Sequence, residues 1–312
     1  MLGRRSFGAS CQRFTGHPYA ILVFGQSFYR DQSLELNSWE NVILTDRFIR
    51  RLIPSTAKLS YNPMFRVVGD VISEIPSLLY SEFRGLPPNH LRVRIGVGNK
   101  ILFNHGYHLQ AGAGFWLSWL SSGYVKADSD ILEIGCGCGR IAHHLRGDWF
   151  VGSYVGIDID QELLDWCASN FPAPKFTFLP SPHVSATYAS RPLDGGALIT
   201  FPEDWEKDFI YSTSLYTHLL EKELENYTRE SFRVLRPNGI MYMTFFCLNS
   251  VELGNRWTFS HKIGEAFVEN IKYPEAAVAY TRDFMERLCH SVGFRQVLII
   301  EGPGQSALIC RK

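Results

Sequence analysis

From residue 131 onward, short apolar runs alternate with stretches in which apolar residues recur at helical spacing. The runs predict strands at 131–134, 154–159, 175–179, 208–212, 240–247, 297–301 and 307–310. The helical spacing predicts helices at 140–145, 161–170, 219–235 and 281–292. Strands that alternate with helices are typical of a parallel sheet. We therefore expect a doubly wound, mostly parallel α/β sheet of seven strands.

The first part of the chain follows a different pattern. Residues 1–88 are predicted to be irregular and partly helical, because prolines interrupt them. Pro87-Pro88 should end any helix that reaches it. Within this part, Val67 to Leu79 has the spacing of a short amphipathic helix that breaks or kinks at Pro76. The sequence thus predicts a mainly helical or irregular N-terminal extension ahead of the sheet.

Composition and charge exclude several classes of protein. The 312 residues are 46% hydrophobic, which rules out global disorder, and 31 basic residues balance 31 acidic ones. A nucleic-acid binder normally has a basic excess, and no apolar run reaches the length of a membrane span. The seven cysteines include no Cys-x-x-Cys pair, so a reducing, cytoplasmic compartment is expected. Residues 1–30 contain arginines but no acidic residue. Organelle transit peptides and basic terminal tails share this composition.

A glycine-rich turn follows the first predicted strand, in the sequence Glu133-Ile134-Gly135-Cys136-Gly137-Cys138-Gly139. Glycine allows a backbone to approach a ligand closely, because it has no Cβ. The spacing Gly-x-Gly-x-Gly differs from the Gly-x-Gly-x-x-Gly of dinucleotide folds and lacks the Gly-Lys-Ser/Thr of a P-loop. Asp158 ends the second predicted strand, where a carboxylate can accept both hydroxyls of a ribose. A helix N-cap is the alternative role for Asp158, although Asp160 fits that role better.

These two motifs resemble those of the class I S-adenosylmethionine-dependent methyltransferases. The family's first motif is an apolar strand, an acidic residue and Gly-x-Gly-x-Gly, which Ile131 to Gly139 match. Its second feature is an acidic residue that ends the second strand, matched by Asp158. Residues 208–215 and 233–239 look like the family's fourth strand and the junction to its fifth. The residues of these motifs are similar to those of a broad, mostly bacterial branch of the family, whose methyl acceptors are often unassigned.

The resemblance implies a Rossmann-like methyltransferase domain at 105–312, with S-adenosylmethionine as cofactor. The aromatic residues ahead of the sheet suggest that the extension at 1–104 is a lid or substrate cap. The implied cofactor contacts come from the glycine turn and from the ends of two further strands: Glu133, Gly135, Cys136, Gly137, Gly139, Asp158, Ile159 and Ser212. One position departs from the family. Many members have an acidic residue after the third strand for the adenine amino group, whereas this chain has Leu179-Pro180-Ser181-Pro182-His183. Ser181 or a backbone group is the candidate there.

On the acceptor side, residues after the fourth strand should face the methyl group, since this strand lies beside the first at the switch point. Tyr216 and His218 are the titratable groups there, and His218 is the candidate general base. A histidine that only packs or forms a hydrogen bond is the alternative, and His105, His108 and His261 stay open as other bases.

Two further patterns suggest other chemistry. Cys136, Cys138, His143 and His144 suggest a zinc site, but both thiols lie inside the glycine turn and structural sites favour wider Cys spacing, so no metal is expected. Asn62-Pro63-Met64-Phe65 echoes the motif of amino-group methyltransferases, yet it precedes the glycine turn and lacks a second proline. A simple turn is the alternative.

The sequence therefore predicts a methyltransferase that acts on a hydroxyl of a small molecule or glycan intermediate, with neither nucleic acid nor membrane as partner. Two alternatives are a nicotinamide-dependent oxidoreductase of Rossmann type, which the glycine spacing disfavours, and a non-catalytic relative that keeps the fold as a binding module. Aromatic residues before residue 130, together with Trp257 and His261, are predicted to wall the acceptor pocket. Core packing is the alternative for most of the former.

Overall fold

The computed structural model describes residues 62–95, 102–181, 198–248, 250, 257–302 and 304–312. All of them belong to one compact unit, Asp46–Lys312. The expectations for residues 1–30 lie outside the described residues. The division at residue 104 stays a prediction. No helix among the described residues is long and apolar enough to cross a membrane.

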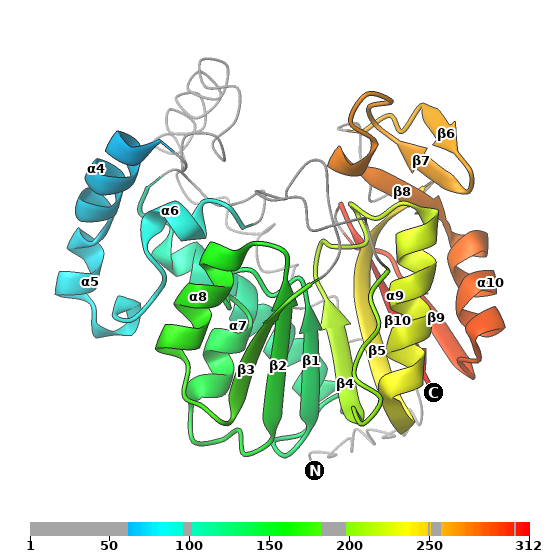
Figure 1. The fold of residues 1–312 in the computed structure, drawn as a ribbon, viewed down its shortest axis with the longest axis horizontal. Helices are drawn as coiled ribbons and strands as arrows, with labels where there is room; N and C mark the ends of the chain where they lie inside the picture. The colour runs from blue at the N-terminus through cyan, green and yellow to red at the C-terminus, as the bar shows by residue number, and fades with distance from the viewer. Residues whose placement is uncertain (1–61, 96–101, 182–197, 249, 251–256, 303) are drawn as a thin grey trace, which may run out of the picture. The chain divides into compact units, whose positions relative to one another are not determined.

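The centre of the unit is a twisted sheet whose seven main strands are all at the predicted places (Figure 1). Their bounds are β1 Asp130–Ile134, β2 Ser153–Asp158, β3 Phe176–Pro180, β4 Lys207–Ser212, β5 Leu235–Leu248, β9 Gln296–Ile300 and β10 Ser306–Arg311. Five strands run parallel in the order β3-β2-β1-β4-β5. β10 is antiparallel to β5, and β9 is antiparallel to β10. The order reverses between β1 and β4, which is the switch point where ligands bind in such sheets.

Three short strands that the sequence pattern did not reveal extend the far end of β5. They are β6 His261–Ile263, β7 Ala266–Val268 and β8 Val278–Thr281, with the 3₁₀ helix η5 Pro274–Ala276 between the last two. β6, β7 and β8 form an antiparallel ladder, and β8 pairs in parallel with Phe246–Leu248 at the end of β5. We call β6–β8 the accessory sheet. Runs of three or four residues are too short for a periodicity to stand out.

Helices cover both faces of the main sheet. The helices are α7 His105–Ser121, α8 Gln161–Asn170, α9 Glu221–Val234 and α10 Arg282–Val292. α9 and α10 pack against the face that holds Leu132 and Ile134, while α7 and α8 cover the face that holds Ile131. Trp116 and Trp119 of α7 are buried in this second layer, so they belong to the core and not to a pocket wall.

Local chemistry explains where the helices begin and end. α8 has the predicted bounds, because the Asp160 side chain caps it by accepting from the Glu162 N–H. Thr281 caps α10 in the same way, and Gly293 ends it with a φ of +122°. The predicted helix at 140–145 is instead a short 3₁₀ helix, η3 Ala142–Arg146. It lies between two residues outside helical geometry, Gly139 and Gly147, which leave no room for a longer helix.

The described part of the N-terminal region is helical, as predicted. It contains α4 Pro63–Ser73, α5 Ile75–Leu79, the 3₁₀ helix η2 Ser81–Phe83 and α6 Asn89–Arg92. The helical pattern breaks at Glu74, two residues before Pro76. The Asn62 side chain accepts from the N–H groups of Met64 and Phe65, so the Asn-Pro sequence is the start of a helix.

Candidate functional site

The glycine turn connects β1 to η3 at the switch point, and β2 holds it in place. The N–H groups of Gly135 and Cys136 both donate to the carbonyl of Ile157, at 2.8 and 3.0 Å. The Gly139 N–H closes the turn by donating to the Cys136 carbonyl at 3.0 Å. The turn therefore has a fixed shape that depends on the strand beside it.

All three glycines of the turn have a left-handed backbone, with φ of +78°, +55° and +72° at Gly135, Gly137 and Gly139. A Cβ on Gly137 would lie 2.7 Å from Ile95 Cγ2, and one on Gly139 would lie 2.7 Å from the Phe171 ring. These two glycines are thus required by the packing of the protein itself as well as by the turn. At Gly135 a Cβ would meet only Leu215, at an ordinary 3.6 Å, so backbone conformation is the constraint there.

Asp158 lies at the end of β2, as predicted, and its carboxylate faces the turn. Oδ2 accepts from the Gly137 N–H at 2.7 Å, and Oδ1 accepts from the Asp160 N–H at 3.0 Å. Burial raises the pKa of Asp158, and these two hydrogen bonds oppose that rise. A carboxylate has about four acceptor sites. Asp158 can therefore support the turn and still accept hydrogen bonds from the hydroxyl groups of a ligand. The next residue, Ile159, is half-buried.

Glu133 lies one step earlier in β1 and is almost completely buried. Its Oε2 accepts hydrogen bonds from the hydroxyls of Tyr154 on β2 and Tyr211 on β4. Burial raises the pKa of Glu133 to about 8, although the two hydroxyls and the charge of Arg140 act in the other direction. The carboxyl group thus joins the three central strands directly below the glycine turn. Its predicted contact with the cofactor stays a prediction.

Ser212 ends β4, beside β1 at the switch point. Its side chain is fully buried, and its Oγ has no hydrogen-bond partner among the described residues. A buried hydroxyl without a partner costs free energy unless a water or ligand satisfies it. The position fits a polar group of a cofactor at the carboxyl edge of the sheet.

The loop after β4 is held by two other strands. Ser214 has a φ of +64°, its N–H donates to Thr244 Oγ1 of β5 at 2.7 Å, and its Oγ bonds to the Gln305 amide. Gln305 precedes β10, so the segments that follow β4 and β9 meet here. Sequence reasoning missed Gln305, because nothing in the sequence links it to a residue 91 positions away.

Of the two titratable groups after β4, His218 bonds to the segment between β7 and β8. Its Nδ1 donates to the Glu275 carbonyl at 2.9 Å, and burial lowers its pKa. The Tyr216 hydroxyl instead bonds to Thr228 of α9 and is fully buried in the core. Tyr216 is therefore a packing residue, and the role of His218 as a base stays a prediction.

The other histidine candidates have different surroundings. His105 and His108 are buried, and burial lowers the pKa of His105 to about 4. His261 begins β6 and is exposed. Among the described residues, no three or more histidine, cysteine or acidic side chains form a metal-binding group. Burial also raises the pKa of the Cys138 thiol to about 12.

Ser181, the candidate beside the adenine position, directs its side chain into the protein. It is buried, and its hydroxyl lies 2.9 Å from the Tyr227 hydroxyl of α9. Its backbone N–H donates to the Asp158 carbonyl at 2.7 Å. The rest of that segment, residues 182–197, lies outside the described residues.

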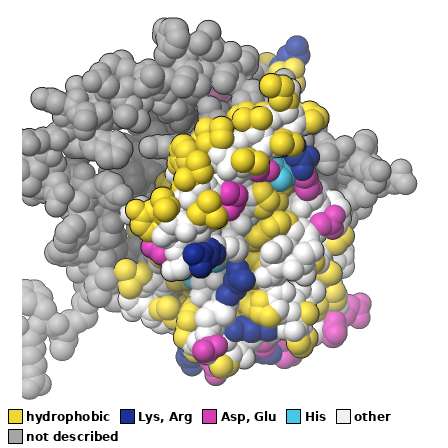
Figure 2. Space-filling model, turned by 90° about the vertical axis from the view of Figure 1, so that its left-hand side faces the viewer, with side chains coloured by type: hydrophobic (Ala, Val, Ile, Leu, Met, Phe, Trp, Pro, Cys, Tyr) yellow, Lys and Arg dark blue, Asp and Glu magenta, His cyan; other side chains and the backbone are white. Residues whose placement is uncertain are grey.

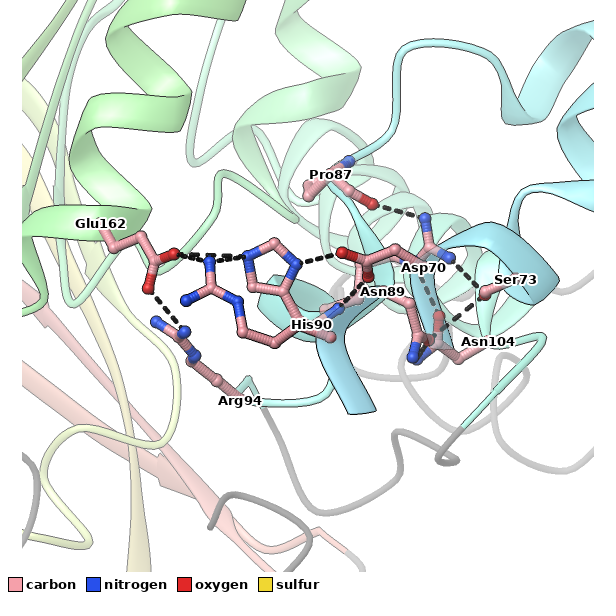
Figure 3. A network of polar contacts seen from close by, with 10 residues as sticks. Asp70, Ser73, Pro87, Asn89, His90, Arg94, Asn104 and Glu162 are labelled. Carbon is pink, nitrogen blue, oxygen red and sulfur yellow. Dashed lines mark hydrogen bonds and ion pairs between the residues drawn. The ribbon is translucent and has the colours of Figure 1, made fainter. Parts of the chain in front are cut away.

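A polar network connects the N-terminal helices to Glu162 in the first turn of α8, which follows Asp158 in the chain (Figure 3). Arg94 bonds to Asp160 at 3.2 Å and to Glu162 at 2.6 Å, and Arg66 also bonds to Glu162. Burial alone would raise the pKa of Glu162, but Arg94 and Arg66 lower it below its ordinary value. The segment before Ile95 is thereby fastened beside both the ribose position and Gly137. Sequence reasoning did not find this link, because its partners lie far apart in the chain.

A second set of contacts fastens the same helices to α7. The Arg92 guanidinium is fully buried and bonds to Asn104, Ser73, His105 and the Pro87 carbonyl. Burial lowers the pKa of Arg92. A buried cation with this many acceptors is stable only in one geometry, so it fixes how the helices lie on α7.

Aromatic side chains gather at the end of β5. Phe246, Trp257 and Phe259 pack together, with ring centroids 5.1 to 5.7 Å apart. Trp257 is half-buried, and its place in a pocket wall stays a prediction. Phe246 lies near the C-terminal end of β5, so the cluster lies at that end of the strand.

Comparison with known proteins gives a family match and several similar structures. Residues 132–243 match the family model described as a methyltransferase domain. A methyltransferase from Methanosarcina mazei is 22% identical over 62% of this chain and 96% of its own, with a TM-score of 0.43. One from Mesorhizobium loti is 15% identical over 63% and 97%, with a TM-score of 0.44. One from Archaeoglobus fulgidus is 14% identical over 67% and 98%, with a TM-score of 0.46.

The matched segment begins in β1 and ends in β5, so it contains the glycine turn, Asp158 and Ser212. These are the residues from which the site was built above. With the doubly wound sheet around them, these residues form a methyltransferase domain of the Rossmann-like, S-adenosylmethionine-dependent type.

Proposed function

We propose that this methyltransferase methylates a hydroxyl group of a small molecule or glycan intermediate. The observation that carries the proposal is the arrangement at the switch point. The Asp158 carboxylate, the left-handed glycine turn and the Ser212 hydroxyl, which has no partner in the described part of the chain, all belong to the carboxyl edge of β1, β2 and β4. Ligands of doubly wound sheets bind at this edge.

The residues at this edge suit the cofactor of the family. Asp158 would accept the ribose hydroxyls, and Ser212 would bond to a polar group that enters between β1 and β4. Glu133 and the packing of Gly137 and Gly139 would keep the turn in the required shape. The cofactor supplies a methyl group activated on a sulfonium centre. The protein's contribution is to align the acceptor and exclude water, which accounts for much of the acceleration in such transfers.

His218 is the proposed base for the acceptor hydroxyl. Its lowered pKa keeps the imidazole neutral at pH 7, and Nδ1 donates a hydrogen bond to the Glu275 carbonyl. A neutral imidazole can take the proton that a hydroxyl loses on methylation.

Two features support an uncharged acceptor. The residues after β4 are Ser212-Thr213-Ser214, which lack the Asn/Asp-Pro-Pro-aromatic motif of amino-group methyltransferases. The cluster of Phe246, Trp257 and Phe259 offers an aromatic wall, and the chain as a whole has no net charge.

The cofactor part is tested by calorimetric titration with S-adenosylhomocysteine. Asp158→Ala should weaken binding about 10–100-fold, because a hydrogen bond to a charged group contributes roughly 1.5–3 kcal/mol. Asp165→Ala is the matched control, since Asp165 is exposed on α8 and should leave affinity unchanged. Equal affinity of wild type and Asp158→Ala would contradict the ribose assignment. Tight binding of a nicotinamide cofactor instead would favour the oxidoreductase alternative.

The acceptor part is tested with donor labelled in the methyl group and a panel of phenols, sugars, amines and carboxylic acids. We expect label in products that resist mild base and acid, as methyl ethers do. Label found mainly in methylamines or in base-labile esters would overturn the assignment of a hydroxyl acceptor. Binding of the cofactor without any transfer across the panel would support the binding-module alternative.

A further inference from the structure

The helices α4 and α5 lie on the protein with their polar side inward. Their buried residues are Gly69, Ser73 and Ser77, spaced four apart along one face. A helix at the surface of a globular protein normally buries its apolar face and exposes its polar one. Here the relation is reversed.

Hydrogen bonds fix this reversed orientation. The Asp70 carboxylate accepts from the backbone N–H of His90 at 2.8 Å and bonds to His90 Nδ1 at 2.6 Å. Ser73 Oγ accepts from the buried Arg92 guanidinium at 2.9 Å. Ser77 Oγ donates to the Phe83 carbonyl at 3.3 Å. Rotating either helix to hide its apolar side would break these bonds, so the orientation is a stable property of the fold.

The consequence is an apolar face on the outside of the molecule. We define it as the nine exposed hydrophobic side chains from Met64 to Tyr80, which include Val71 at 68% exposure and Leu78 at 75%. Figure 2 views the side of the molecule that carries α4 and α5, and hydrophobic side chains form a nearly continuous area there. Among the described residues, nothing covers this face.

The size of the apolar face matches one half of a protein–protein interface. Complete burial of one such side chain removes on the order of 60–120 Å² from water, so nine partly exposed ones present roughly 500 Å². A standard interface buries about 800 Å² on each partner, of which somewhat more than half is apolar, or roughly 450–520 Å². The apolar face therefore supplies what one partner of a stable complex needs.

The charges around the face indicate which partner fits. Acidic Glu74 and Glu82 and basic Arg84 are exposed on the same helices and the turn after them, so both signs of charge border the face. A surface with both signs is complementary to its own copy, because in a twofold contact each copy supplies what the other requires. The zero net charge of the whole chain also removes long-range repulsion between copies.

An anionic membrane fits the same face less well. Membrane-surface helices are rich in basic residues beside the apolar face, whereas residues 62–95 include no lysine, and the side chains of two of their four arginines, Arg92 and Arg94, are buried. Glu74 also lies inside the apolar stripe, between Ile72 and Ile75, where it would be repelled by acidic lipids.

We propose that the apolar face of α4 and α5 is the interface of a twofold homodimer. Each copy would place its Met64–Tyr80 segment against the same segment of the other copy. Because these helices also hold Arg94 and Ile95 beside the glycine turn through α6, dimerisation would brace the part of each copy that adjoins the cofactor position. The proposal does not depend on the acceptor or on the cofactor contacts.

The test is analytical ultracentrifugation of the full chain over a range of concentrations. Wild type should be dimeric at about 10 µM, and Val71→Asp and Leu78→Asp should each weaken association at least tenfold, because each would bury an unpaired charge. Val151→Asp is the matched control: Val151 is 72% exposed but lies outside these helices, and the variant should stay dimeric.

A second measurement does not depend on the variants. Backbone amides of α4 and α5 in the wild type should exchange hydrogen more slowly as the concentration rises, whereas amides of α10 should not change. The proposal is overturned by a wild type that stays monomeric up to about 100 µM, by dimers that persist in both aspartate variants, or by exchange that ignores concentration. Monomers that bind phosphatidylserine vesicles through Val71 would also overturn it, in favour of a lipid surface.

Discussion

The buried carboxyl of Glu133 makes the stability of this fold depend on pH in an unusual direction. Its pKa is raised from 4.5 to about 8 in the folded protein, so the folded state keeps a proton that the unfolded chain releases. The stabilisation is complete below pH 4.5 and is lost as the pH rises toward 8. Most buried carboxylates with cationic partners behave in the opposite way.

The size of the effect follows from the shift. Between the two pKa values, the free energy of unfolding falls by about 1.4 kcal/mol for each pH unit, which amounts to roughly 3 kcal/mol between pH 5 and pH 8. Glu133→Gln removes the ionisable group, while its amide oxygen can still accept from the hydroxyls of Tyr154 and Tyr211. The variant should therefore gain roughly 3 kcal/mol relative to wild type over this pH range.

The measurement is urea denaturation of wild type and Glu133→Gln at half-unit intervals from pH 5 to pH 8. Glu206→Gln is the control, because the Glu206 side chain is 74% exposed and its loss should leave the wild-type pH dependence in place. A stability difference between wild type and Glu133→Gln that stays constant with pH would refute the raised pKa. Titration of the same variant with S-adenosylhomocysteine tests the predicted cofactor contact of Glu133.

Three further predictions concern the turn, the base and the acceptor. Gly137→Val should abolish binding of S-adenosylhomocysteine and destabilise the fold by at least ~1 kcal/mol, because its Cβ would lie 2.7 Å from Ile95 at a φ of +55°. Gly114→Ala is the control, since the space around Gly114 is open. Native affinity in Gly137→Val would contradict the argument. The wild-type rate should increase with pH through an apparent pKa below 6.5 and then level off, whereas His218→Gln should be slow and lack this step; an unchanged profile in His218→Gln would exclude the base. Turnover should change little between low and moderate ionic strength, and a steep loss with salt would indicate a nucleic-acid or strongly anionic acceptor.

The sequence predicted best those elements whose ends are marked by a capping residue or a glycine. Asp160 and Thr281 cap α8 and α10, and Gly293 ends α10, so the helical periodicity and the termini agreed. The Gly-x-Gly-x-Gly spacing and Asp158 likewise placed the switch point, since strand, turn and carboxylate are close in sequence. Local signals of this kind do not depend on which distant segments meet.

What the sequence did not predict depends on distant contacts. Glycine at 137 and 139 is needed for packing against Ile95 and Phe171 as well as for a ligand, and no local pattern reveals either neighbour. The predicted turn at 236–239 is part of β5, where the pairing of β5 with β4 shifts register. Asn238 has a left-handed backbone there, with a φ of +67°. The amphipathic pattern at 67–79 predicted a helix correctly, but periodicity cannot tell which side of that helix faces the protein.

The length of β5 has a consequence for how acceptor specificity can diverge. The strand runs for 14 residues, pairs with β4 and β10 through most of them, and then continues into the accessory sheet through Phe246–Leu248. The aromatic wall is therefore an outgrowth of one rigid strand and shares no residue with the turn or with Asp158. Trp257 and Phe259 can therefore change without altering the glycine turn or Asp158, whereas Glu275 and Thr281 are tied to His218 and to α10. A designer who wants a new acceptor should vary these two aromatic positions and keep the rest of the accessory sheet.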